Sequence, residues 1–167
     1  MRVQFRVGVI AGLLACCAMF GSSSYAQEAV VGVSDPDSLF HDKDPKLDRN
    51  KQATYHIFKD LLEANHWELA DKWLTKKYIQ HNPNAASGLE GVVKYFTQVR
   101  KAQPTPIPEK FAKTKVVSVV AQGDYVIVAM PRSGTDSKGQ TFTTTWFDMY
   151  RFVDGKADEH WDGATRQ

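Results

Sequence analysis

One segment with strict two-residue alternation constrains the fold of this chain more than any other. Side chains two residues apart lie on the same face of a strand. On this segment one face carries aromatic residues, a threonine and a single carboxylate: Phe142, Thr144, Trp146, Asp148, Tyr150 and Phe152. A carboxylate among aromatic rings costs several kcal/mol unless it is paired, hydrogen-bonded or neutralised. Asp148 therefore predicts the floor of a small-molecule pocket.

The residues that follow predict a hairpin. Asp154-Gly155 is typical of a two-residue turn of the primed type, in which glycine accepts a positive φ. The next strand, 157–163, carries His160 and Asp162 two positions apart, which places them on one face about 6–7 Å apart. Counting outward from the turn sets Asp148 near residues 160–162, to within one or two residues. Two carboxylates and an imidazole can then converge.

Helical segments precede the strands along the chain. Apolar spacing predicts helices over 44–64, 66–75 and 89–101, and a short extended piece over 78–82. A proline-rich linker at 104–108 ends the helical half. Further strands are expected over 113–121 and 125–132, before the long aromatic strand at 141–153. Helices first and strands second indicate an α+β fold, with three helices packed on one face of a curved antiparallel sheet.

The N-terminal residues are typical of an export signal. Arg2 and Arg6 precede an apolar run to Phe20, and small residues lead to Ala26. We therefore expect a signal peptide over 1–26, an irregular leader over 27–43 and one domain over 44–167. A periplasmic or secreted protein follows from this prediction. Leu13-Leu14-Ala15-Cys16 leaves open a lipoprotein signal, although leucine fits poorly before the small residue.

The charge of the mature chain argues against nucleic-acid binding. Removing Arg2 and Arg6 takes 21 basic residues to 19, which equals the 19 acidic residues. A neutral chain lacks the basic surface that phosphate backbones require. Both cysteines, Cys16 and Cys17, lie within the expected signal, so the mature chain has no thiol chemistry. No second membrane-spanning segment is expected.

Three local patterns resemble the SnoaL-like polyketide cyclase family of the nuclear-transport-factor-2-like fold. They are Tyr78-Ile79-Gln80-His81-Asn82-Pro83 with Gly88-x-x-Gly91, then Trp146-Phe147-Asp148-Met149-Tyr150-Arg151-Phe152, and Asp154-Gly155-Lys156 leading to Glu159-His160-Trp161-Asp162. The resemblance implies a cone-shaped half-barrel with an internal pocket. It also implies acid/base chemistry without metal or organic cofactor, as in aldol-type cyclisation, isomerisation or dehydration. The fold often carries a dimer, so a homodimer is expected.

The candidate site combines these observations. One acid in such a pocket can be neutral and donate a hydrogen bond while the other accepts a proton. We expect Asp162 or Asp148 as base, with His160 and also His81 orienting or donating. The substrate, a small apolar or aromatic carbonyl compound, would lie against four aromatic residues: Trp146, Tyr150, Tyr95 and Phe96. A non-catalytic ligand-binding or dimerisation module of the same fold is the alternative function.

Other interpretations of these residues remain open at this point. Asp148 could pair with Arg151, Arg132 or another cation and only fix strand register. The last strand could instead turn Glu159 and Trp161 inward. A further alternative is that His81 only caps the break before the loop. His81 and His160 with one carboxylate could bind iron or zinc, but no helical metal-ligand spacing supports a metal site, and none is expected.

Overall fold

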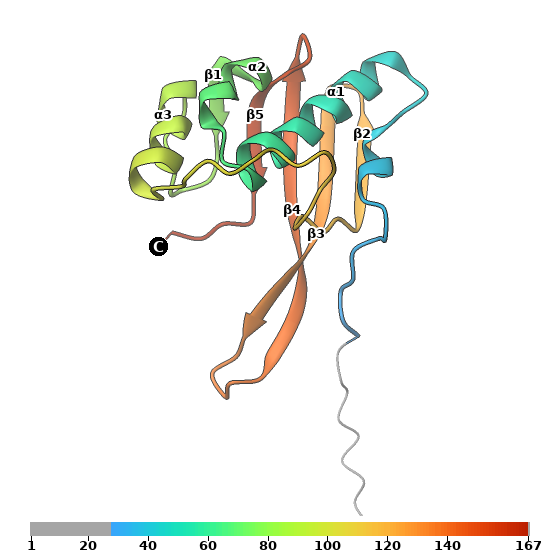
Figure 1. Ribbon diagram of the computed structural model, residues 1–167, viewed down its shortest axis with the longest axis vertical. Helices are drawn as coiled ribbons and strands as arrows, with labels where there is room; N and C mark the ends of the chain where they lie inside the picture. The colour runs from blue at the N-terminus through green and yellow to red at the C-terminus, as the bar shows by residue number, and fades with distance from the viewer. Residues whose placement is uncertain (1–27, 167) are drawn as a thin grey trace, which may run out of the picture.

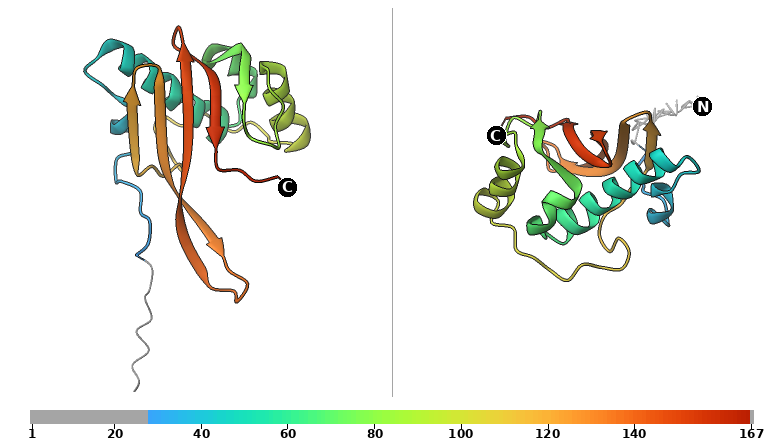
Figure 2. Two further views of the ribbon diagram at one scale, coloured as in Figure 1. Left: turned by 180° about the vertical axis from the view of Figure 1, so that it is seen from behind. Right: turned by 90° about the horizontal axis from the view of Figure 1, so that it is seen from above.

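A curved sheet covered on one face by helices forms the body of the protein (Figures 1 and 2). The computed structural model describes residues 28–166. The sheet has five strands in the order β1-β5-β4-β3-β2. They are β1 (Leu74–Gln80), β2 (Ser118–Gln122), β3 (Tyr125–Thr135), β4 (Thr141–Val153) and β5 (Lys156–Asp162). The predicted α+β class is confirmed, and the bounds of β4 match the predicted strand.

The sheet is mixed, whereas the sequence predicted an antiparallel one. β1 pairs parallel with β5, and the other neighbours pair antiparallel. β1 also begins at Leu74, inside the segment predicted to be helical, so the second helical region is short. It comprises a 3-10 turn, η3 (Trp67–Leu69), and α2 (Ala70–Trp73). Pairing with the last strand therefore prevails over the local helical pattern.

The first helix runs along the inner face of the sheet (Figure 2). α1 (Pro45–His56) begins as expected, because the Asp44 carboxylate accepts hydrogen bonds from the backbone N–H groups of Lys46 and Leu47. It continues into a π-helical segment, η2 (Ile57–Glu63). α3 (Leu89–Lys94) likewise continues into η4 (Tyr95–Val99). Both π-helical segments contribute side chains to the cavity described below.

The leader is more ordered than the expected irregular segment. It forms a 3-10 turn, η1 (Asp37–Phe40), which places the Phe40 ring at 0% exposure in the core. That ring meets Tyr55 and Phe111 edge to face. Residues 1–27, which contain the predicted signal, lie outside the described part of the chain. β2 begins at Ser118, later than predicted.

A β-bulge interrupts the β4–β5 hairpin close to its turn. Asp154 and Gly155 have positive φ values of 50° and 78°, as the predicted turn requires. Phe152 then pairs with Ala157, but Arg151 pairs with Glu159, so two residues of β5 lie opposite one residue of β4. The extra residue reverses the alternation of β5 beyond the bulge. His160 therefore points inward together with Ala157, and both are buried.

Candidate functional site

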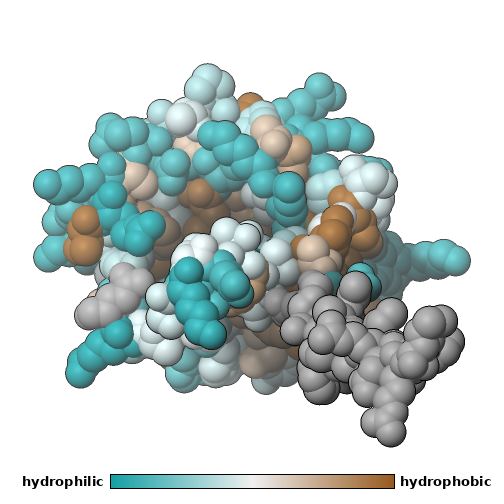
Figure 3. All heavy atoms as spheres, turned by 90° about the horizontal axis from the view of Figure 1, so that it is seen from below, coloured by the Kyte–Doolittle hydropathy of each residue, from teal (hydrophilic) through white to brown (hydrophobic). Residues whose placement is uncertain are grey.

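An apolar cavity lies between the sheet and the helices. It has a volume of about 120 Å³ and is lined by side chains from η2, η3, β1, the loop after β1, α3, η4, β4 and β5. Seen from below, apolar residues gather in a hollow framed by polar ones (Figure 3). Most of the lining is aliphatic or aromatic. The polar residues that line it are Gln80, Asn82, Asp148, His160 and Asp162.

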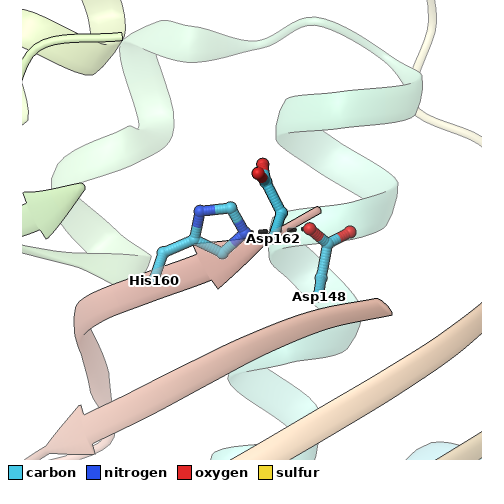
Figure 4. A group of neighbouring side chains, drawn as sticks. All are labelled: Asp148, His160 and Asp162. Atoms are coloured by element: carbon cyan, nitrogen blue, oxygen red, sulfur yellow. Dashed lines mark hydrogen bonds and ion pairs between the residues drawn. The ribbon is translucent and has the colours of Figure 1, made fainter. Parts of the chain in front are cut away.

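Three of these polar residues form a compact group at the sheet. One ligand atom from each of Asp148, His160 and Asp162 lies within 4.8 Å of the other two. The side chains extend from β4 and β5 toward the helical layer (Figure 4). The ladder pairs Asp148 with Asp162 and Tyr150 with His160, so all of them share one face of the hairpin. The predicted convergence of the two acids and the imidazole is therefore present.

The hydrogen bonds of His160 define which of its ring nitrogens carries a proton. Nδ1 lies 2.8 Å from Oε1 of Gln80, and the same oxygen accepts the backbone N–H of Asn82 at 3.0 Å. An oxygen that accepts from a backbone N–H is fixed as an acceptor, so Nδ1 of His160 donates. Nε2 is left to face Oδ1 of Asp148 at 2.9 Å. His160 and Asp148 therefore share a proton across that contact.

Each carboxylate has a second fixed donor. Oδ1 of Asp148 accepts the indole N–H of Trp146 at 3.3 Å. Oδ2 of Asp162 accepts from the side-chain amide of Asn82 at 2.7 Å, and Oδ1 accepts the backbone N–H of Ala164 at 2.8 Å. The polar end of the cavity thus presents two hydrogen-bonded carboxyl groups beside an imidazole.

Comparison with known proteins agrees with the observed fold. A family model for SnoaL-like polyketide cyclases matches residues 52–165. The chain belongs to the SnoaL-like polyketide cyclase family. Among solved structures, a candidate polyketide cyclase from Acidithiobacillus ferrooxidans is 18% identical, with a TM-score of 0.50 over 68% of this chain and 86% of that one. A candidate SnoaL-like polyketide cyclase from Jannaschia sp. CCS1 is also 18% identical, with a TM-score of 0.47 over 74% and 91%. No protein with a curated description matches significantly.

Of the four aromatic residues predicted to bind substrate in this SnoaL-like protein, three line the cavity and one does not. Tyr95, Phe96 and Tyr150 line the cavity. Trp146 lies beside it and acts on the site through its hydrogen bond to Asp148. The Phe96 ring stacks on Trp67 with 3.8 Å between centroids. An aromatic wall therefore faces the polar end, built from both the helical layer and the sheet.

Two buried tyrosines adjoin the acids. Burial, and then the negative charge of Asp148, raise the pKa of Tyr78 and the pKa of Tyr150 well above their ordinary values. Both phenols consequently stay neutral at physiological pH. A neutral phenol can donate a hydrogen bond to an oxygen in the cavity.

His81 is not brought to the site. It lies on the opposite face of β5, where its Nε2 is 2.9 Å from Oε1 of Glu159 and its ring stacks on Trp161. The alternative set of two histidines and one acid for a metal is therefore not assembled within residues 28–166. Asp148, His160 and Asp162 could offer three ligand atoms to an ion. Each of them already has hydrogen-bond partners that an ion would displace.

Sequence reasoning missed Gln80 and Asn82, although both hold site residues in place. The signal was present, because Tyr78, Gln80 and Asn82 alternate along an extended segment while the prediction singled out His81 between them. The alternative pairings of Asp148 are also resolved: Arg151 contacts Asp158 and Glu159. Arg132 instead lies over the Trp146 ring, with 4.2 Å from Cζ to the centroid.

No helix within residues 28–166 combines the length and apolar character needed to cross a bilayer.

Proposed function

We propose that this SnoaL-like protein abstracts a proton next to a carbonyl group in a small neutral compound. The observation that carries the proposal is the convergence of Asp148, His160 and Asp162 at the polar end of the apolar cavity. Positioned acids and bases of this kind contribute about 10²–10⁴ in rate. Cyclisation of the aldol type, isomerisation and dehydration all begin with this step.

The hydrogen bonds assign a role to each group. The oxygens of Asp162 accept hydrogen bonds from an amide and a backbone N–H, which do not give up a proton at neutral pH, so this carboxylate is available as the base. The proton taken from the substrate moves to Asp162, and the separate proton shared by His160 and Asp148 can be donated to the developing oxygen or carbon. Gln80 holds the imidazole ring through Nδ1. Tyr78 and Tyr150, as neutral phenols beside the cavity, can stabilise an enolate oxygen.

The size and charge of the cavity limit the range of possible substrates. A volume of about 120 Å³ is of the same order as the ~150 Å³ cavity known to bind benzene. It is well below the ~300–1,000 Å³ of pockets for drug-sized ligands. The negative charge at the polar end disfavours carboxylates and phosphates. We therefore propose a neutral compound with one ring, or an equally small part of a larger one, inside the cavity.

Exchange of α-protons with solvent tests the chemistry without knowledge of the product. The wild-type protein is incubated with cyclohexanone in D₂O, and loss of the α-proton signal is followed by NMR. Exchange faster than in buffer supports the proposal. Asp162→Asn should lower the protein-catalysed rate by about 10²–10⁴ while leaving ketone affinity largely unchanged. No exchange above buffer across a panel of one-ring ketones would contradict it.

A non-catalytic binding module is the second candidate, because the apolar lining favours retention of a ligand whether or not it reacts. Native mass spectrometry of the purified mature protein distinguishes the two. A module should retain a neutral aromatic or lipid-like molecule, and its retention should persist in Asp162→Asn. It should also give no α-proton exchange in the wild-type protein.

We further propose that the chain is exported and cleaved after Ala26. The charged start, the apolar run and the small residues before that position support this. Expression of the full chain in a bacterium, followed by N-terminal sequencing of the processed product, checks it. A new N-terminus at Gln27 is expected. A lipidated Cys16 or Cys17 would instead establish a membrane-anchored form.

A homodimer is proposed through the outer face of the sheet. Val120, Ile127 and Phe147 project from that face with exposures of 57%, 36% and 55%. Val120 pairs with Ile127, so these side chains form part of one patch. Light scattering should give twice the monomer mass, and Phe147→Lys should return the protein to a monomer. A monomeric wild-type protein at high concentration contradicts this proposal.

A further inference from the structure

The bulge in β5 decides which side chains enter the cavity. Regular pairing from the turn would place Asp158 opposite Arg151 and Glu159 opposite Tyr150. Glu159 and Trp161 would then point inward, and His160 would point outward, because a one-residue slip exchanges the two faces of a strand. The observed register has the extra residue, with Arg151 opposite Glu159 and Tyr150 opposite His160. The site exists only in the bulged register.

Arg151 contacts both residues of the bulge on the outer face. Its Nη2 lies 2.6 Å from Oδ2 of Asp158, and its Nε lies 2.9 Å from Oε2 of Glu159. Thr75 on β1 donates to the other oxygen of Asp158 at 2.7 Å. Arg151 is itself only about one-quarter exposed. A planar guanidinium with donors at two edges suits two carboxylates that oppose it together.

The two contacts distinguish between the registers. In the regular register Arg151 would still face Asp158, but Glu159 would lie in the cavity beside Asp148. The hydrogen bond from Nε of Arg151 to Glu159 therefore belongs only to the bulged register. His81 strengthens the same choice, because it binds the second oxygen of Glu159 at 2.9 Å and stacks on Trp161 outside the cavity.

We propose that Arg151 is a positioning residue that holds the β5 bulge and thereby turns His160 and Asp162 into the cavity. It touches neither the cavity nor a substrate, and it acts through the two carboxylates of the bulge. This inference rests on the proposed function only in treating His160 and Asp162 as the functional site. The orientation of His160 can be measured whether or not the protein turns over a ketone.

Chemical modification of histidine reports this orientation directly. Diethyl pyrocarbonate reacts with accessible imidazole, and peptide mass spectrometry locates the modified residue. His160 is 6% exposed, whereas the His81 side chain is 44% exposed and serves as an internal reference. In Arg151→Met we expect His160 to react at least about tenfold faster than in the wild type. That is the factor that loss of a charge-assisted hydrogen bond can produce in a conformational equilibrium.

Matched variants separate positioning from general loss of stability. Lys156→Met removes another polar contact of β5, from Nζ to the carbonyl of Asp71, and leaves the bulge intact. It should leave the protection of His160 unchanged. Arg151→Lys should give intermediate reactivity, since an ammonium cannot span both carboxylates as the guanidinium does.

A deletion provides the sharpest control. Removing Asp158 restores regular pairing with Arg151 opposite Glu159, and His160 then faces inward by simple alternation. Arg151→Met should therefore no longer expose His160 in the chain that lacks Asp158. If that double variant does not fold, Arg151→Lys and Lys156→Met still decide the matter. Continued protection of His160 in a folded Arg151→Met protein overturns the inference.

Discussion

Nε2 of His160 lies 2.9 Å from Oδ1 of Asp148, although the ladder pairs these residues with Tyr150 and Asp162 respectively. The contact is therefore diagonal across two neighbouring strands. Diagonal neighbours lie about 7–8 Å apart at the backbone, a distance that an imidazole and a short carboxylate span together. The contact between His160 and Asp148 follows from the register of the hairpin. It places the proton that they share at the polar end of the cavity.

Asp148→Asn should weaken catalysis without abolishing ligand binding. The amide keeps an oxygen toward His160 but removes the charge, so a charge-assisted hydrogen bond becomes a neutral one. We expect the α-proton exchange rate to fall by about 10–100-fold, which corresponds to the ~1.5–3 kcal/mol of such a bond. NMR exchange in D₂O measures the rate. A change in ketone affinity alone would assign Asp148 to binding.

Gln80→Met should disturb the protonation of His160. Methionine is similar in size but offers no strong acceptor, so Nδ1–H loses its partner inside the protein. We expect the free energy of unfolding to fall by about 1–3 kcal/mol. Nitrogen NMR of the imidazole should show a changed tautomer or proton occupancy at Nδ1. Gln80→Glu, which retains an acceptor oxygen, is the matched control, and an unchanged spectrum in Gln80→Met would contradict the assignment.

Glu63 should make the fold sensitive to acid. Its carboxylate accepts hydrogen bonds from three consecutive backbone N–H groups, at residues 112–114, and from the Thr114 hydroxyl. Burial raises the pKa of Glu63. The hydrogen bonds from Thr114 and the backbone lower it by more than burial raises it, so the net pKa lies below its ordinary value. A lowered pKa stabilises the folded state above the unfolded value, and this contribution is lost as the pH falls through the folded value.

Glu63→Gln should therefore cost about 1 kcal/mol of unfolding free energy at pH 7, after allowance for solvent screening. The difference from wild type should shrink below about pH 4, near the unfolded pKa of glutamate. Urea denaturation at several pH values measures both effects. A difference that stays constant down to pH 2 would show that the charge of Glu63 is not responsible.

Phe96→Ala should enlarge the cavity. The ring lines it and stacks on Trp67, so its removal should cost about 2–4 kcal/mol of stability. The variant should accept neutral two-ring ketones that the wild type excludes. Native mass spectrometry with one-ring and two-ring ligands measures the change in selectivity. Equal acceptance of two-ring ligands by the wild-type protein would show that the cavity volume does not limit the substrate.

The face pattern of the long strand was predictable from sequence because it is local. Alternation from Trp146 to Phe152 and the Asp154-Gly155 turn identify the hairpin and its inner face. The family resemblance then supplied the curved shape. The outer end of the strand does not follow the pattern, since Phe142 is 44% exposed where the β3–β4 hairpin extends beyond the helical layer (Figure 1).

The bulge, the parallel edge strand and the roles of Gln80 and Asn82 depend on contacts between distant segments. The sequence of β5 is compatible with either face of the strand pointing inward. Which face does so depends on Arg151 from the neighbouring strand. Leu74 begins a strand only because β5 is available for pairing. The periodicity of a segment indicates which of its faces is buried. It does not identify the strand or helix that packs against that segment.

The parallel pairing of β1 with β5 has a consequence for the order of folding. Gln80 and His160 are separated by 80 positions along the chain, and the cavity cannot close until these two segments meet. Contacts this distant slow folding. The helices and the β2–β3 hairpin depend on local contacts, so they should form before the cavity is complete.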